Sequence, residues 1–291
     1  MAVPTVKLLS GCQMPLLGLG TFKIKGYENV FKTLEAALAS GYRSFDTASV
    51  YRNETDIGRA FKILLPKFSL QRQDIFITSK LGPAQQGKTN ASQALLKSLQ
   101  HLDCEYLDLY LIHWPGAHKL KPADKMHQKL RAESWVEMEE AFRQGKVKSI
   151  GISNYLPSHI EELLSVCTVK PSVLQIEYHP HLIQTTVKSL CETHAIHLQA
   201  YSSLGTSSAE NKLIKDPKVM EISQQVQKSP AQVLLRWAVQ QQIGVLPKST
   251  NPSHIAENID VFSFSLSEDQ MAQLSGLDQQ THYCWDPQQV R

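Results

Sequence analysis

The strongest constraint on the fold is a regular alternation of short apolar runs with amphipathic segments. Segments with apolar residues three and four positions apart, as in amphipathic helices, lie between most of the apolar runs. Eight runs have the length and composition of buried strands: 42–46, 75–79, 108–112, 149–153, 173–177, 197–201, 244–247 and 261–264. The first three begin at residues 42, 75 and 108, so their starts are 33 residues apart each time. That spacing fits one strand, one helix and two loops.

Strand–helix alternation with mostly apolar strands predicts a parallel sheet covered by helices. Eight such units predict one α/β domain over residues 1–291, folded as a closed (β/α)8 barrel, or TIM barrel. An open doubly wound sheet is the alternative, and it predicts a glycine-rich phosphate loop after the first strand. The sequence there is Thr47-Ala48-Ser49-Val50, which has no glycine. Residues 6–9 and 12–18 flank a Ser10-Gly11 turn and predict an N-terminal β-hairpin that caps the barrel floor.

Composition and charge narrow the class of protein. Apolar residues make up 42% of the chain and the net charge is +3, a mild balance that predicts no nucleic-acid partner. The five cysteines are widely spaced and include no C-x-x-C pair, as expected for reduced thiols in a cytoplasmic protein. The N-terminal segment lacks the apolar core of a signal peptide, and no segment approaches the ~20 apolar residues of a membrane span. We therefore expect a cytoplasmic protein with no membrane partner.

Polar residues cluster where the predicted strands end, which is where a barrel places its catalytic groups. A lone lysine, histidine or aspartate at such a place usually has a plain structural explanation. An acid, a phenol, an ammonium and an imidazole on one rim are hard to explain by packing. The strand ends carry Asp46 with Tyr51 five residues on, Lys80, His113-Trp114, Ser153-Asn154, Gln175, Tyr201-Ser202 and Lys248-Ser249-Thr250.

These side chains can together form a proton donor for a developing alkoxide. A phenol has a pKa near 10, and an adjacent ammonium such as that of Lys80 favours the phenolate and lowers the pKa. Asp46 can hold Lys80 charged and in place, while His113 orients a substrate oxygen towards Tyr51. No side chain can supply a hydride, so this chemistry implies a nicotinamide cofactor.

Five segments resemble, in order, the motifs of the aldo-keto reductase family: GYRSFDTASVYRNE (41–54), ITSKLG (77–82), YLDLYLIHWPG (106–116), GKVKSIGISNY (145–155) and LPKSTNPSHIAEN (246–258). The chain is similar to the family from end to end, and most of all to its aldehyde, glyoxal and aldose reductase-like branch. The resemblance implies a monomer that reduces small-molecule aldehydes and ketones with NADPH. It also implies that Asp46, Tyr51, Lys80 and His113 are the catalytic tetrad, with Tyr51 as the general acid.

The resemblance implies binding residues as well. Phe22, Tyr51, His113 and Trp114 would contact the substrate. The cofactor would be bound by Gly20, Thr21, Phe22, Asp46, Ser153, Asn154, Gln175, Tyr201, Ser202, Leu204, Gly205, Lys248, Ser249, Thr250, His254, Glu257 and Asn258. Among these, Ser153, Asn154 and Gln175 would hold the carboxamide and Tyr201 would stack on the nicotinamide ring. Lys248 beside two hydroxyls suits the 2′-phosphate and favours NADPH over NADH.

The chain departs from the family pattern at several positions. Phe22 and Gly82 stand where many or some members carry a tryptophan, which implies a wider pocket. Ser203 replaces a common proline, and His254 stands where many members carry an arginine that reaches the adenine and 2′-phosphate. The tail is shorter than in members with a long specificity loop, which implies broad substrate choice. The sequence is equally consistent with Tyr283 and Trp285 of the tail reaching the pocket and with their lying on the surface.

Three alternatives remain open at this point. Within the enzyme class, the chain could be a prostaglandin or steroid carbonyl reductase with a deep apolar pocket. Outside that class, it could be a cofactor-binding regulatory protein or a structural protein on the same fold. His179 and His181, near Glu177, have a spacing that metal ligands can have, but one short cluster without a second ligand set favours a structural role. We therefore predict no metal site.

Overall fold

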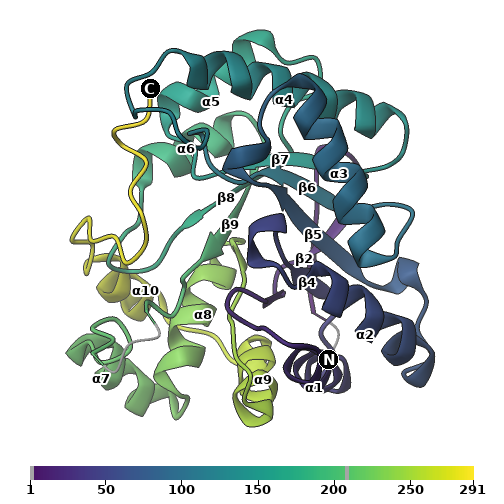
Figure 1. The fold of residues 1–291 in the computed structure, drawn as a ribbon. Helices are drawn as coiled ribbons and strands as arrows, with labels where there is room; N and C mark the ends of the chain where they lie inside the picture. The colour runs from purple at the N-terminus through teal and green to yellow at the C-terminus, as the bar shows by residue number, and fades with distance from the viewer. Residues whose placement is uncertain (1–2, 207–209) are drawn as a thin grey trace.

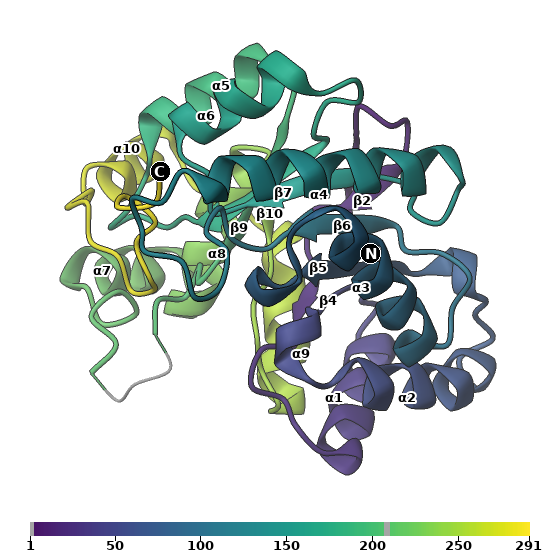
Figure 2. The same ribbon diagram turned by 45° about the horizontal axis from the view of Figure 1, so that its top comes forward.

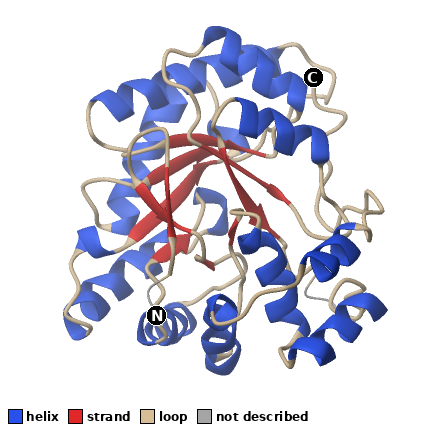
Figure 3. Ribbon diagram, turned by 180° about the vertical axis from the view of Figure 1, so that it is seen from behind, coloured by secondary structure: helices blue, strands red, loops and turns tan. Residues whose placement is uncertain are grey.

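The structure, a computed structural model, describes residues 3–206 and 210–291. Over these ranges eight parallel strands curl into one sheet with helices outside it (Figure 3). The strands are β3 (Leu19–Gly20), β4 (Ser44–Asp46), β5 (Phe76–Leu81), β6 (Leu109–Ile112), β7 (Ile150–Ser153), β8 (Val173–Glu177), β9 (His197–Tyr201) and β10 (Gly244–Val245). Their order in space follows their order in the chain. The predicted (β/α)8 barrel is therefore confirmed.

Backbone hydrogen bonds close the barrel between its first and last strands. Gly18 N donates to Val245 O at 2.9 Å, and Val245 N donates to Leu16 O at 2.8 Å. A Cβ atom on Gly20 would lie 2.9 Å from the Leu246 carbonyl oxygen, so the close approach of the two segments requires glycine there. Closure leaves no free edge in the sheet.

Helices surround the sheet, as Figures 1 and 2 show from two directions. Apolar residues at helical spacing, such as Val30, Leu34 and Leu95, are buried in the core between the helices and the sheet. The helices are α1 (Tyr27–Ala39), α2 (Glu54–Lys67), α3 (Lys88–Leu102), α4 (Met126–Arg143), α5 (Pro157–Val166), α6 (Thr185–Thr193), α7 (Pro217–Val226), α8 (Pro230–Gln240), α9 (Pro252–Ile259) and α10 (Glu268–Ser275), with 3-10 turns η1 (Ser49–Tyr51), η2 (Arg72–Asp74), η3 (Pro83–Gln85) and η4 (Asp260–Phe262). None of the helices in the described ranges is long and apolar enough to cross a membrane.

One predicted strand is wrong. The run 261–264 begins in the 3-10 turn η4, where Val261 is buried and packs with the helices rather than pairing in the sheet. The eighth strand is β3 instead, a two-residue element that lies directly after the predicted hairpin. The apolar residues of 261–264 serve helix packing, and β3 is too short to show a strand pattern.

The predicted N-terminal hairpin is confirmed, with a shorter second arm. β1 (Thr5–Lys7) pairs antiparallel with β2 (Gln13–Pro15), and residues 16–20 continue into the barrel wall. Leu8 and Met14 of the hairpin pack with residues from the beginnings of the barrel strands, among them Phe76, Leu109 and Val173. The hairpin thus closes the end of the barrel opposite the polar strand ends.

Candidate active site

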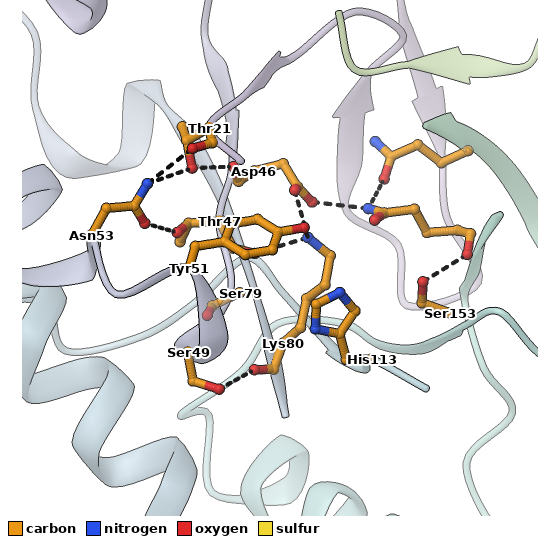
Figure 4. Close-up of polar contacts among 12 residues, drawn as sticks. Thr21, Asp46, Thr47, Ser49, Tyr51, Asn53, Ser79, Lys80, His113 and Ser153 are labelled. Atoms are coloured by element: carbon orange, nitrogen blue, oxygen red, sulfur yellow. Dashed lines mark hydrogen bonds and ion pairs between the residues drawn. The ribbon is translucent and has the colours of Figure 1, made fainter. Parts of the chain in front are cut away.

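The predicted tetrad comes together at the carboxyl ends of neighbouring strands (Figure 4). Asp46 is the last residue of β4, Lys80 lies near the end of β5, and His113 follows β6. Tyr51 ends η1, the 3-10 turn that follows β4. Parallel strands in consecutive register bring these four side chains to one rim.

Lys80 is the centre of this group. Its ammonium lies 2.5 Å from Asp46 Oδ1, 2.9 Å from the Thr47 carbonyl oxygen and 3.4 Å from the Tyr51 hydroxyl. Lys80 is fully buried. A buried ammonium is stable only when it is paired and hydrogen-bonded, and these three partners meet that condition.

Asp46 is held from its other side. Gln175 Nε2 donates to Asp46 Oδ2 at 2.8 Å and to Gln199 Oε1 at 2.9 Å. Both carboxylate oxygens of Asp46 are therefore engaged, one by Lys80 and one by Gln175. The amide chain through Gln199 fixes the carboxylate, and with it the Lys80 ammonium, against the barrel interior.

The pKa of Tyr51 differs in direction from the expectation based on Lys80 alone. Burial raises the pKa of the Tyr51 hydroxyl, and the Lys80 charge lowers it only in part, so the net shift is upward. The effect of burial on the pKa is larger than the effect of the Lys80 charge, because desolvation disfavours the phenolate. Burial by itself would lower the pKa of Lys80, but Asp46 and Tyr51 outweigh that effect and the pKa of Lys80 is raised.

His113 is a neutral imidazole. Burial and the nearby Lys80 charge hold the pKa of His113 well below 6.5. Within the described ranges its buried Nδ1 has no hydrogen-bond partner. Its ring lies edge-on to Tyr51 with centroids 5.7 Å apart. A neutral ring in this place can hydrogen-bond a substrate oxygen without adding a second positive charge beside Lys80.

The residues assigned to the nicotinamide carboxamide lie next to the tetrad. Ser153 Oγ donates to the Gln175 carbonyl oxygen at 2.8 Å. Asn154 has a left-handed backbone with φ of 63° and donates to the His113 carbonyl oxygen at 2.9 Å. Tyr201 donates its hydroxyl proton to Asn154 Oδ1 at 2.6 Å. These contacts tie the ends of β6, β7, β8 and β9 into one polar wall.

The segment after β9 forms a tight turn. Ser202 has φ of 51° and Gly205 has φ of 76°, and Gly205 N donates to Ser202 O at 2.7 Å. Asn211 Nδ2 donates to the Leu204 carbonyl oxygen at 2.6 Å and supports the turn from beyond it. Such a turn presents backbone N–H groups on a concave surface, an arrangement that suits an anion.

The residues assigned to the 2′-phosphate and adenine lie farther out. Lys248 and Thr250 are exposed, and no salt bridge to Lys248 occurs in the part of the chain that the structure describes. Ser249 Oγ accepts from Asn251 N at 3.1 Å just before α9. The last three assigned residues differ in exposure: His254 is exposed, Asn258 is buried, and Glu257 accepts a hydrogen bond from Ser229 Oγ.

Aromatic rings continue from the tetrad to the surface. Phe22 lies 5.1 Å from Tyr51 between ring centroids, and His113 stacks on Trp114 at 6.0 Å. Trp114 in turn meets Trp285 of the tail edge to face at 4.5 Å. The tail therefore does reach the rim through Trp285. The sequence left that possibility open.

Tyr283 and the two histidines have a different role. His181 lies between the Tyr283 hydroxyl at 2.8 Å and Asp216 Oδ2 at 3.0 Å, and His179 Nε2 lies 3.2 Å from Glu177 Oε1. The ring of Tyr283 lies beside both histidines. Within residues 3–206 and 210–291, no group of three or more His, Cys, Asp or Glu side chains could hold a metal ion. These histidines anchor the tail.

Three supporting residues were not predicted from the sequence. Thr47 supplies its carbonyl oxygen to Lys80, and Gln199 holds Gln175. Asn53 is buried, accepts from Thr47 Oγ1 at 2.7 Å and donates to the Thr21 carbonyl oxygen at 3.0 Å, which fixes the loop after β3. A polar residue inside the apolar run 197–201 was a signal for Gln199; Asn53 lies in a polar loop and had none.

Comparisons with known proteins identify the family of the chain. The sequence model of the Aldo/keto reductase family matches residues 16–279. Glyoxal reductase from Bacillus subtilis (strain 168) is 38% identical over 274 residues, covering 94% of this chain and 92% of the relative. Aldo-keto reductase family 1 member A1 from Mus musculus is 39% identical over 302 residues, covering 97% and 92%. The aldose reductase structure from Schistosoma japonicum superposes with a TM-score of 0.86 at 36% identity, covering 96% and 94%. The chain therefore belongs to the aldo/keto reductase family.

Proposed function

We propose that this protein reduces aldehydes and ketones to alcohols with NADPH, and that Tyr51 is the proton donor. Family membership makes the protein an oxidoreductase and supports carbonyl reduction. The observation that carries the specific proposal is the enclosed group of Tyr51, Lys80 and Asp46 beside a neutral His113. NADPH supplies the hydride when it is bound.

The protonation states of this group suit reduction. The raised pKa of Tyr51 keeps its proton on the hydroxyl at neutral pH, so the acid is ready to donate. Once the proton has passed to the substrate oxygen, the Lys80 ammonium at 3.4 Å stabilises the phenolate that remains. His113 orients the carbonyl oxygen towards the Tyr51 hydroxyl.

The cofactor assignment is supported by the chemistry of the donor set. Ser153 carries a hydroxyl group and Asn154 carries an amide group, and both can hydrogen-bond a carboxamide. Tyr201 offers a ring face at the same wall. The Ser202–Gly205 turn suits a pyrophosphate, and the exposed Lys248 with its two neighbouring hydroxyls suits a 2′-phosphate. This set favours NADPH over NADH.

Small aldehydes and dicarbonyls are the substrates that this proposal favours. Phe22 and Gly82 leave an open rim, and Trp114 with Trp285 offers one aromatic wall. Glyoxal reductase among the relatives is consistent with a dicarbonyl substrate.

The test is turnover by the purified full chain. Oxidation of NADPH is followed by absorbance with methylglyoxal as substrate, and NADH is used in parallel. We expect turnover with both cofactors and a higher kcat/KM with NADPH. A protein that binds NADPH tightly but reduces no member of an aldehyde and ketone panel would instead be a cofactor-binding regulatory or structural protein. A protein that reduces only steroids or prostaglandins would contradict the small-substrate assignment.

A further inference from the structure

Arg131 in α4 connects three separate segments near the active-site rim. Its exposed fraction is only 2%, which is unusual for an arginine. Its guanidinium donates to the Pro115 carbonyl oxygen at 3.1 Å, to the Arg291 carbonyl oxygen at 2.7 Å, and to both carboxylate oxygens of Glu162 at 2.8 to 3.0 Å. Arg131 therefore joins the loop after β6, the tail and α5.

His159 in α5 holds the tail at Val290, the residue before Arg291. Leu156 N donates to His159 Nδ1 at 3.2 Å, so this ring nitrogen is the acceptor. The other nitrogen, Nε2, therefore carries the proton and donates to the Val290 carbonyl oxygen at 2.9 Å. Burial and the Arg131 charge lower the pKa of His159, which keeps the ring in this neutral form. The Val290 side chain is itself buried, next to Gly116.

The two segments that Arg131 and His159 hold each carry a tryptophan. Trp114 directly precedes Pro115, and Trp285 lies in the tail between Val290 and the Glu177 anchor. At that second anchor, Glu177 accepts from Tyr283 N at 2.7 Å and from Cys284 N at 3.2 Å. The tail is thus fixed on both sides of Trp285, and Figure 1 shows it running from α10 to its end near α5.

Trp285 is only partly buried. Its exposed fraction is 52%, and its ring contact is with Trp114. Between the anchors the tail spans a cavity of about 350 Å³ whose lining includes Asn154, Tyr201, Trp285 and Pro287. A segment that bridges a cavity depends on its anchors for its position.

We propose that Arg131 and His159 are positioning residues that hold the Trp114–Trp285 pair in place and thereby set the preference of the enzyme for aromatic carbonyl substrates. This inference rests on the proposed function. The row of rings from Tyr51 through His113 and Trp114 ends at Trp285, so a substrate phenyl group extending outwards from the reacting carbonyl meets this pair. Neither Arg131 nor His159 touches the reacting atoms.

The test compares phenylglyoxal with methylglyoxal, two substrates that share the dicarbonyl group and differ in one ring. Val290→Lys removes the buried valine contact and places a cation near Arg131, which unseats the end of the tail. Arg131→Met removes the guanidinium. In both variants we expect KM for phenylglyoxal to rise about fivefold to tenfold, the value of one aromatic contact. We expect kcat for both substrates and KM for methylglyoxal to stay at the wild-type values. Trp285→Ala removes one ring of the pair, so it should raise KM for phenylglyoxal by at least as much.

A matched control separates this effect from general destabilisation. Arg72 also pairs with a carboxylate, Asp108, and donates to two backbone carbonyl groups, but it lies at the opposite end of the barrel. Arg72→Met should lower thermal stability and leave the ratio of the two KM values unchanged. Arg131→Met should raise the ratio of KM for phenylglyoxal to KM for methylglyoxal, and Arg131→Lys should bring that ratio part of the way back to the wild-type value.

A readout without turnover completes the test. Trp135 and Trp237 are buried, so acrylamide quenching of tryptophan fluorescence reports on Trp114 and Trp285. Val290→Lys should increase quenching. Unchanged quenching and an unchanged KM ratio in Val290→Lys and Arg131→Met would overturn the inference. If wild type reduces neither substrate, the proposed function fails, and the quenching result alone decides whether the residues position the pair.

Discussion

Lys80 Nζ lies 2.5 Å from Asp46 Oδ1, and both side chains are buried at the rim of the barrel. This pair is the electrostatic centre of the site. Asp46→Asn removes the negative charge and leaves a buried ammonium without its partner. We expect unfolding in urea to show a loss of about 3 to 5 kcal/mol, together with a large loss of activity.

A double variant tests the cause of that loss. Asp46→Asn combined with Lys80→Met contains no unpaired charge, so it should be more stable than Asp46→Asn alone. A single variant as stable as wild type would mean that the two groups do not interact as a buried ion pair.

The cofactor preference is expected to depend on Lys248. Lys248→Met should weaken NADPH binding and leave NADH binding unchanged, because only NADPH carries the 2′-phosphate. His254→Arg should strengthen NADPH binding by adding a second cation for the same group. Fluorescence titration measures both dissociation constants, with the exposed Lys97 on α3, changed to Met, as control. If Lys248→Met weakened NADPH and NADH binding equally, Lys248 would contact a part of the cofactor other than the 2′-phosphate.

The pH dependence of reduction follows from the states of Tyr51 and His113. The pKa of Tyr51 is raised from 10.0, so its acid form is lost only at higher pH. The pKa of His113 is well below 6.5, so the ring gains a proton only in more acidic solution. We expect kcat with methylglyoxal to be constant from about pH 6.5 to pH 9. A titration with a midpoint between pH 7 and 8 would contradict these assignments.

Stability should fall in mild acid because of His197. Burial lowers the pKa of His197 from 6.5 to about 4, and its Nε2 has no partner within residues 3–206 and 210–291. Between these two values the unfolded chain binds more protons than the folded one, so the free energy of unfolding decreases as pH falls. We expect His197 to contribute a decrease of about 2 to 3 kcal/mol.

Urea unfolding between pH 7 and pH 4 checks this contribution. His197→Gln should show a shallower decrease than wild type. Part of the decrease should persist, since the pKa values of His113, His159 and His179 are also lowered. An identical pH dependence in the two proteins would show that His197 is not kept neutral by folding.

The fold was largely predictable because its main units are local. The regular spacing of the strand starts and the helical spacing of apolar residues both arise within single strand–helix units. The eighth strand could not be predicted from such local patterns. β3 is two residues long and owes its place to closure against β10, while the apolar run at 261–264 is explained by helix packing. Closure is a long-range event and leaves no periodic signal.

The grouping of the candidate site residues was predictable for a similar reason. Asp46, Lys80 and His113 lie at or just after the carboxyl ends of strands, so a correct barrel brings them together. The supporting contacts come from distant parts of the chain: Gln175 holds Asp46 from 129 residues away, and Arg131 holds the tail at Arg291 from 160 residues away. The net pKa shift of Tyr51 could not be predicted from the sequence either, because the burial of a phenol depends on the folded structure around it rather than on its neighbours in sequence.

The most direct measurement is single-turnover oxidation of bound NADPH by methylglyoxal in wild type and Tyr51→Phe. Phenylalanine keeps the ring and removes only the hydroxyl that lies 3.4 Å from Lys80 Nζ. We predict the same NADPH dissociation constant in both proteins and a loss of about 10² to 10⁴ in the rate of the variant. A Tyr51→Phe variant that binds NADPH and reduces methylglyoxal at the wild-type rate would contradict the assignment of Tyr51 as the acid.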